Sequence, residues 1–205
     1  MVRTTKSIRS HVEALAAREP AFAAVVEKYG IPGPRNSEPG AHTLLRTIVG
    51  QQVSVAAARS MWAKLEAAYG TPPDLGAILE ATDGDLRLAG ISRQKAGYVR
   101  SLANLVLSGE LDLHRLPTED EEAVALLTRI KGIGRWSAEI YLLFAEGRPD
   151  VWPAGDLAVQ IEIGRLLGLP DKPSEKQLRE LAEAWRPYRG AAAVLAWHSY
   201  NSAVL

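Results

Sequence analysis

The chain of 205 residues contains no cysteine. This absence excludes disulfide bonds, zinc sites built on thiolates and iron–sulfur clusters, so any chemistry must depend on other side chains. No apolar run approaches the roughly 20 residues that a membrane-spanning helix needs, and no apolar core of signal-peptide length follows the opening residues. We therefore expect a soluble cytoplasmic protein without membrane contact.

The chain also has no net charge, with 24 basic and 24 acidic residues. Neutrality argues against a protein that coats nucleic acid by electrostatics alone, but it allows a local basic face. Acidic residues gather at 119–122, whereas basic residues gather at Arg93, Lys95 and Arg100, and at Lys131 and Arg135. A positive surface and scattered solvated charge both fit this distribution.

Alanine and leucine at helical spacing dominate the sequence. Apolar residues recur every three or four positions and no stretch alternates with a period of two, so we predict an all-α protein. Thr118 and Glu121 have the spacing of a capping box at a helix start. Helices are predicted at 8–17, 20–29, 41–50, 54–69, 74–80, 83–88, 92–108, 119–129, 135–145, 155–167, 174–183 and 187–203.

Two glycines, Gly132 and Gly134, bracket one isoleucine between two predicted helices. Such a turn can offer backbone N–H groups and the positive end of a helix to a phosphate. Glycine more often simply ends a helix, but apolar residues on both sides would lock these two helices together. We interpret residues 120–145 as a helix-hairpin-helix, with Lys131, Arg135 and Ser137 as further nucleic-acid contacts. Residues 88–92 weakly repeat the pattern with one glycine and add little to the prediction.

A single carboxylate follows this glycine hairpin (residues 130–135). Asp156 closes the segment Trp152-Pro153-Ala154-Gly155 and precedes an apolar helical stretch. Aspartate at that place is usually a helix N-cap. Beside a bound DNA strand, it could instead stabilise the positive charge that develops on a sugar when its base departs. Both interpretations stay open from the residues alone.

Aromatic and amide side chains suggest how a base would be handled. Trp62 and Trp185 are assigned to the core, whereas Trp136 and Trp197 are either core residues or walls of a cavity that holds an extruded base. The polar pair Gln51-Gln52 links two helices. It is either a surface turn or a rigid loop whose side chain fills the gap that the base leaves.

Residues 48–54, 130–139 and 152–157 together closely resemble the helix-hairpin-helix (HhH-GPD) DNA glycosylase superfamily, specifically the 3-methyladenine DNA glycosylase II (alkylpurine) branch. The resemblance covers about residues 18–200. It implies a two-lobed all-α fold with the DNA and base cleft between the lobes. Residues 1–38 and 150–205 would form one discontinuous lobe, and residues 39–149 the other.

The resemblance also implies a role for each matching residue. Asp156 corresponds to the catalytic aspartate, Gln52 to the side chain that wedges into the vacated stack, and Ile140 stands where some relatives have a pocket tyrosine. Trp136 and Trp197 would complete the base pocket, and Gly132 and Gly134 would grip a phosphate. No cofactor is required, although the family's hairpin often holds Na⁺ or K⁺ on backbone oxygens, here those of Thr128, Ile130 and Ile133.

Ser137 stands where bifunctional members have a nucleophilic lysine, so no Schiff base and no strand cleavage are expected. The implied activity is that of a monofunctional hydrolase, which flips alkylated bases such as 3-methyladenine and 7-methylguanine out of duplex DNA and cuts the N-glycosidic bond, initiating base excision repair. We expect a monomer in a bacterial-type cytoplasm, on the nucleoid when bound. The alternatives are a non-catalytic DNA-binding module, a bifunctional lyase, and a glycosylase for another lesion.

Overall fold

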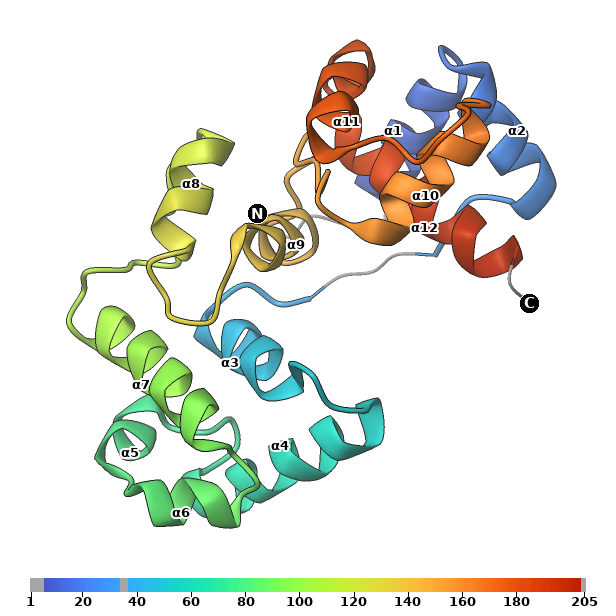
Figure 1. Ribbon diagram of the computed structural model, residues 1–205. Helices are drawn as coiled ribbons and strands as arrows, with labels where there is room; N and C mark the ends of the chain where they lie inside the picture. Colours follow the sequence, from blue (N-terminus) through green and yellow to red (C-terminus); the bar gives the residue numbers. More distant parts are fainter. Residues whose placement is uncertain (1–5, 34–36, 204–205) are drawn as a thin grey trace. The chain divides into compact units, whose positions relative to one another are not determined.

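The computed structural model describes residues 6–33 and 37–203, and within these ranges every regular element is a helix and none is a strand (Figure 1). The predicted all-α class is therefore confirmed. Residues 1–5, where we expect no signal peptide, lie outside the described residues. The helices are α1 (Lys6–Ala16), α2 (Pro20–Tyr29), α3 (Ala41–Gly50), α4 (Val55–Tyr69), α5 (Leu75–Glu80), α6 (Asp83–Leu88), α7 (Arg93–Leu107), α8 (Asp120–Leu127), α9 (Arg135–Phe144), α10 (Leu157–Leu166), α11 (Glu175–Ala182), the 3-10 turn η1 (Glu183–Trp185) and α12 (Arg189–Ala203).

Short polar side chains begin several of these helices. The Ser54 hydroxyl accepts a hydrogen bond from the Ala57 N–H at 3.2 Å, and the Asp74 carboxylate accepts one from the Ala77 N–H at 2.7 Å. Each side chain satisfies an amide that the first helical turn leaves without an intrahelical partner. Because these signals are local, the sequence places the helix ends within about two residues of those observed.

Helix α8 begins differently from the prediction. Its N-cap is Glu119, which makes no side-chain capping hydrogen bond, so the predicted capping box of Thr118 and Glu121 is wrong. The Glu121 carboxylate instead accepts a hydrogen bond from the Arg135 guanidinium. A charge-assisted bond of this kind is stronger than a bond to a neutral backbone amide.

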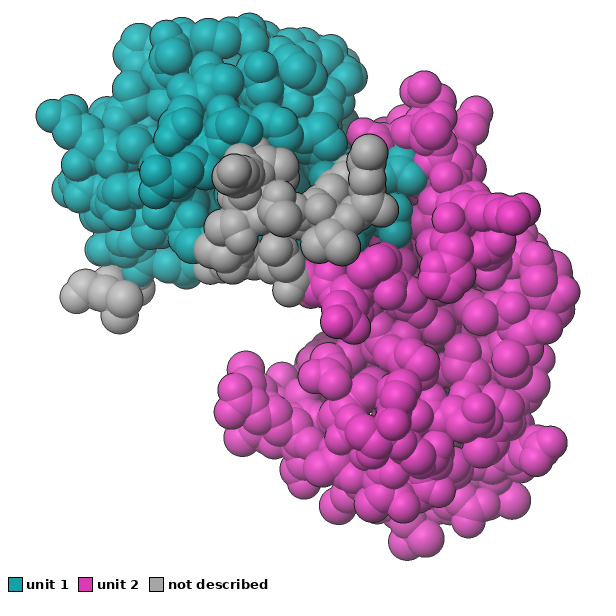
Figure 2. Space-filling view, turned by 180° about the vertical axis from the view of Figure 1, so that it is seen from behind, with its two compact units in different colours: residues 1–36, 142–205 teal, residues 37–141 magenta. Residues whose placement is uncertain are grey.

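Contacts divide the chain into two compact units (Figure 2): unit 1 comprises residues 1–36 and 142–205, and unit 2 comprises residues 37–141. The second boundary falls inside α9, earlier than the expected 149/150. The side chains of α9 explain this position. The Tyr141 hydroxyl accepts a hydrogen bond from the Gly40 N–H of unit 2 at 2.8 Å, whereas Leu143 packs closely against Gly190 of unit 1.

Helix α12 is the central helix of unit 1 and packs against α1, α2 and α10. Its first turns consist of small residues, so neighbouring chain segments approach closely. A Cβ atom at Gly190 would lie only 2.6 Å from the Pro149 carbonyl oxygen. Trp185 packs edge-on against Phe22 and Trp152, at centroid distances of 5.1 and 5.5 Å, and its predicted place in the core is confirmed.

In unit 2, α7 packs against α3, α5 and α6. It buries Ala96, Val99, Leu102 and Ala103 at helical spacing, so one face of the helix supplies the core. Trp62 of α4 is also buried, as predicted. No helix within residues 6–33 and 37–203 has the length and apolar character of a membrane span.

Candidate functional site

Asp156 of unit 1 is the N-cap of α10. Its Oδ1 atom accepts hydrogen bonds from the Val159 backbone N–H at 3.0 Å and from the Trp197 indole N–H at 3.1 Å. The capping interpretation is therefore confirmed. The indole donor is an addition that a cap does not require, and it fixes the orientation of a half-buried carboxylate.

The segment before Asp156 is held by hydrogen bonds that involve α10, α11 and the loop between them. The Trp152 indole donates to the Leu178 carbonyl at 3.2 Å. The buried Gln160 amide donates to the Ala154 carbonyl at 2.9 Å and accepts from the Lys172 ammonium at 2.7 Å. The carboxylate consequently stands on a rigid loop, which is what an electrostatic catalyst needs.

Trp197 is buried, with 9% of its surface exposed, and its ring lies 5.7 Å from that of Phe144. The structure thus places it directly beside the carboxylate of Asp156. Its predicted role as a wall of the base pocket stays a prediction.

The glycine hairpin lies in unit 2. Gly132 has a φ of +85°, in the region that favours glycine, and the Ile133 N–H donates to the Ile130 carbonyl at 3.0 Å to close the turn. Both isoleucines are buried, which confirms the apolar seam of the helix-hairpin-helix. Within the part of the chain that the structure describes, the Gly132 and Gly134 amides have no hydrogen-bond partner. They can therefore donate hydrogen bonds to an anion.

Helix α7 packs against this hairpin. The Tyr98 ring lies so close to Gly132 that a Cβ atom there would come within 2.3 Å of it. The Lys131 backbone N–H donates to the Ser101 hydroxyl at 3.1 Å, while the Lys131 side chain is exposed. The backbone of the hairpin is consequently fixed and one lysine beside it reaches solvent.

Arg135 is engaged by two carboxylates. It donates to Glu121 and, from its Nε atom at 3.0 Å, to Glu139, which is only 3% exposed. The hydrogen bond that Arg135 donates to Glu121 is the main cause that raises the pKa of Arg135, and the charge of Glu139 adds to it. Its predicted contact with nucleic acid stays a prediction.

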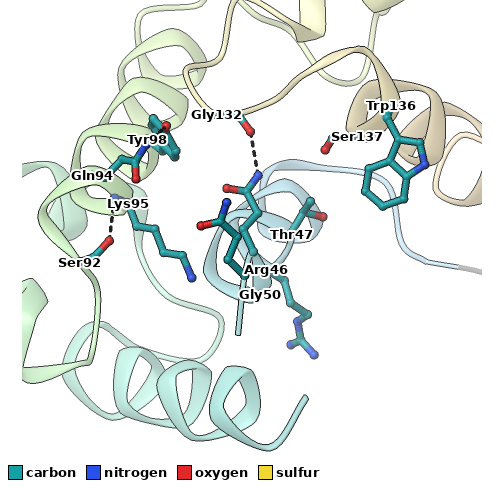
Figure 3. Close-up of a pocket in the computed structure, with 12 residues that line it drawn as sticks. Arg46, Thr47, Gly50, Ser92, Gln94, Lys95, Tyr98, Gly132, Trp136 and Ser137 are labelled. Carbon is teal, nitrogen blue, oxygen red and sulfur yellow. Dashed lines mark hydrogen bonds between the residues drawn. The ribbon is translucent and has the colours of Figure 1, made fainter. Parts of the chain in front are cut away.

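The loop between α3 and α4 carries the predicted wedge. Gln52 is exposed and has a φ of +54°, the one positive φ of a non-glycine residue among those described. Such strained backbone often occurs at functional sites. The neighbouring Gln51 amide donates to the Gly132 carbonyl at 2.7 Å, shown as a dashed line in Figure 3. Gln51, predicted as a DNA contact, therefore joins this wedge loop (residues 51–54) to the glycine hairpin.

These elements of unit 2 surround a pocket of about 660 Å³ (Figure 3). Its lining comprises Arg46, Thr47, Gly50, Gln51, Gln52, Ser92, Gln94, Lys95, Tyr98, Gly132, Trp136 and Ser137. The sequence prediction names five of these, including Trp136, which is 47% exposed, and Ser137. It misses the contributions of α3 and α7 to the pocket. The one-glycine pattern at residues 88–92 is the signal that could have revealed the α7 part.

The remaining predicted residues lie near the hairpin. Ile140 is half-buried on α9, and the Thr128 hydroxyl donates to the Ala125 carbonyl at 3.0 Å. No group of three or more His, Asp or Glu side chains suited to a metal ion occurs in residues 6–33 and 37–203. The predicted cation site depends on backbone oxygens of Thr128, Ile130 and Ile133 instead.

Comparison with known proteins agrees with this geometry. The family model described as HhH-GPD superfamily base excision DNA repair protein matches residues 45–187. The Bacillus subtilis protein YfjP is 30% identical over 76% of this chain, which spans only 57% of that protein. A solved DNA-3-methyladenine glycosidase from Bacillus halodurans is similar with a TM-score of 0.85 and 30% identity, covering 95% of this chain and 90% of its own.

A second solved structure is the Schizosaccharomyces pombe 3-methyladenine DNA glycosylase Mag1 in complex with abasic DNA. It is similar with a TM-score of 0.77 and 27% identity, covering 96% of this chain and 97% of its own. The family match extends over more than half of the sequence and includes the wedge loop, the glycine hairpin and Asp156. The chain therefore belongs to the HhH-GPD superfamily of base excision DNA repair proteins.

Proposed function

We propose that this protein is a monofunctional DNA glycosylase, which removes alkylated bases such as 3-methyladenine and 7-methylguanine from duplex DNA by hydrolysis. The products are the free base and an abasic site. The observation that carries the proposal is the carboxylate of Asp156, held by the amide of Val159 and the indole N–H of Trp197. The names of the solved relatives support the same substrate class.

In the proposed reaction the bond between the base and the sugar lengthens, and positive charge develops on the sugar. The fixed carboxylate of Asp156 stabilises that charge, and water adds to the sugar carbon. A base methylated at a ring nitrogen already carries positive charge and leaves readily, so one carboxylate suffices. A damaged base is also easier to unstack, which adds selectivity.

DNA would be gripped by the glycine hairpin and opened by the wedge loop. The unpartnered amides of Gly132 and Gly134 suit a phosphate oxygen, and Gln52, exposed on strained backbone, suits insertion into a base stack. Trp136 and Trp197 have π-faces on which a cationic base would stack. Ser137 has no amine for a Schiff base, so the proposal includes no strand cleavage.

A monovalent cation at the hairpin is a separate part of the proposal. The Ile130 carbonyl accepts the Ile133 N–H, but a carbonyl oxygen has a second lone pair. The carbonyl oxygens of Thr128, Ile130 and Ile133 therefore fit a Na⁺ or K⁺ ion that helps to fix a phosphate. DNA affinity measured in K⁺, Na⁺ and choline salts of equal ionic strength tests this. Equal affinity in all three would contradict the cation site.

We further propose that the protein acts as a monomer in the cytoplasm of a bacterial-type cell, bound to the nucleoid while it searches DNA. Sedimentation of the protein with and without duplex DNA tests the monomer. A dimer in both samples would contradict it.

The central test is release of methylated purines from methylated DNA by the wild type and by Asp156→Asn. Asparagine keeps an N-cap acceptor, so folding should survive while excision falls by roughly 100-fold or more. Asp74→Asn is the matched control because Asp74 also caps a helix, accepting from the Ala77 N–H at 2.7 Å, but lies outside the site. We expect full excision from that control.

The rival function is a DNA-binding module in which Asp156 is only a cap. That module would release no base with any of the three proteins, while still binding duplex DNA. Equal release by the wild type and Asp156→Asn would instead keep the glycosylase activity and remove Asp156 from its mechanism.

A further inference from the structure

The pocket of unit 2 contains two cations that the proposed function leaves without a role, Lys95 and Arg46. Lys95 is only 9% exposed, and its ammonium donates to the Val49 carbonyl at 2.7 Å. Neither cation has a carboxylate within ion-pair distance in the described part of the chain, and no acidic residue lines the pocket. The lining therefore carries positive charge without an acidic residue beside it, although Arg46 also borders a neighbouring pocket that contains Glu38 and Glu66.

Several arginines elsewhere in the described part of the chain are paired with acidic residues. Carboxylate partners within 3.0 Å are held by Arg100, Arg129, Arg135, Arg165, Arg179, Arg186 and Arg189. A buried cation without a counter-charge destabilises a folded protein, because desolvation is not offset by attraction. The unpaired state of Lys95 therefore suggests that a ligand supplies the negative charge.

Both cations are held in position. Lys95 lies in the first turn of α7, where its N–H donates to the Ser92 hydroxyl at 3.3 Å, and Figure 3 shows its side chain extending toward the end of α3 at Gly50. The Arg46 guanidinium lies 4.2 Å from the centroid of the Trp62 ring. Little side-chain freedom would be lost if an anion bound between them.

We propose that this pocket binds a phosphodiester group of the DNA backbone, with Lys95 as its charged contact and Arg46 as the second. The site is distinct from the phosphate site at the glycine hairpin, and it rests on the proposed function in that the protein binds duplex DNA. A phosphodiester fits better than a base edge because two uncompensated cations match a negative group, whereas base edges are neutral. The wedge loop borders the same pocket, so DNA that receives Gln52 brings its backbone to these cations.

The salt dependence of DNA binding tests the proposal. Each phosphate contact releases condensed counterions, so log K falls with log salt by about 0.9 per contact. Lys95→Met should therefore reduce this slope by about one, and Arg46→Gln should do the same. Lys95→Arg should keep it. The matched control is Lys64→Met, since Lys64 is exposed on α4 outside the pocket and its loss should leave the slope unchanged.

A second experiment changes the DNA instead of the protein. A duplex with a neutral methylphosphonate at the phosphate next to the flipped nucleotide should bind the wild type more weakly, and it should bind the wild type and Lys95→Met equally. Inorganic phosphate at constant ionic strength should not displace the duplex. Displacement from the wild type but not from Lys95→Met would identify a site for free anions in this pocket and overturn the proposal.

A lower affinity of Lys95→Met with an unchanged salt slope would also overturn the proposal. It would mean that Lys95 only supports the Val49 carbonyl and, through it, the wedge loop. Thermal unfolding of each variant shows whether it is folded. If Lys95→Met does not fold, the salt slope of Arg46→Gln tests the proposal in its place. These measurements depend on DNA binding and not on base excision. If the wild type excised no base, the proposed glycosylase function would be contradicted, but the proposed phosphate site would not.

Discussion

Unit 2 contains two helix–turn–helix segments, each with a left-handed glycine in its turn. The one-glycine turn (residues 88–92) joins α6 to α7, and the glycine hairpin joins α8 to α9. Gly90 and Gly132 have φ values of +86° and +85°. The sequence repeat is weak, and the turns close differently, since the Ile91 N–H donates to the Leu86 carbonyl whereas the Ile133 N–H donates to the Ile130 carbonyl, both at 3.0 Å.

The residues after each glycine also correspond. Ile91 and Ile133 are both buried, with 2% and 3% of their surfaces exposed. The first intrahelical hydrogen bonds match as well, since the Ala96 N–H donates to Ser92 at 2.8 Å and the Ala138 N–H donates to Gly134 at 3.0 Å. A left-handed glycine followed by a buried isoleucine and a helix start is therefore common to both turns.

The two turns differ in the residue that begins the second helix. The Ser92 hydroxyl accepts the Lys95 N–H at 3.3 Å and so satisfies an amide of α7. Gly134 has no side chain that could do this for α9. The backbones differ as well, since the Gly90 N–H donates to the Arg87 carbonyl at 2.9 Å, whereas the Gly132 N–H has no partner in the described part of the chain. The one-glycine turn therefore has fewer amides to offer to a phosphate than the glycine hairpin.

The largest predicted effect is a loss of stability when alanine replaces the left-handed glycine of either turn, and its size depends on what surrounds that glycine. Alanine at Gly132 or Gly90 would occupy a left-handed conformation that costs roughly 1–3 kcal/mol. At Gly132 the added Cβ would also lie 2.3 Å from the rigid Tyr98 ring, whereas at Gly90 it would lie 3.1 Å from the flexible Met61 side chain. Urea unfolding should show Gly132→Ala to be the less stable variant.

The double variant Gly132→Ala with Tyr98→Ala provides the control. It should lose less stability than the sum of the two single variants, because removing the ring removes the collision. Equal losses for Gly132→Ala and Gly90→Ala, with additive behaviour of the double variant, would contradict the close approach.

The comparison also explains how much the sequence could predict. Helix ends and the glycine hairpin depend on local signals, such as apolar spacing, capping side chains and glycine, and they agree with the structure. The pocket depends on α3 packing against α7, which brings Arg46 and Lys95 together from distant positions in the chain. No local pattern contains that information.

Contacts between distant residues also explain where the structure differs from the sequence-based expectations. Glu121 does not form a capping box with Thr118 because Arg135, fourteen positions later, provides a stronger partner. The unit boundary falls inside α9 because Leu143 packs against Gly190 of α12. In both places a contact between distant residues overrides a local preference.

An intermediate effect is predicted when the cap residues of the two turns are exchanged. No atom would lie within 4 Å of a Cβ at Gly134, so Gly134→Ser is sterically allowed. The new hydroxyl should stabilise α9 by a few tenths of a kcal/mol, while it competes with phosphate for the same amides. We expect a slightly more stable protein with weaker affinity for duplex DNA.

Ser92→Gly is the matched reverse variant. It should cost a similarly small amount of stability. Tighter binding by Gly134→Ser would show that the amides of the glycine hairpin are not the phosphate contact.

The smallest predicted effect concerns the third residue of each second helix, which is Lys95 after the one-glycine turn and Ser137 after the glycine hairpin. Burial lowers the pKa of Lys95 below its ordinary value of 10.5. In the pH range between the lowered pKa and 10.5, the unfolded chain binds a proton that the folded chain does not, so stability rises with pH. The stability of the wild type relative to Lys95→Met should therefore increase from neutral pH toward pH 10.5, as measured by urea unfolding. Other titrating groups are common to both proteins and cancel in this difference. A constant difference would mean that Lys95 is as well solvated in the folded protein as in the unfolded chain.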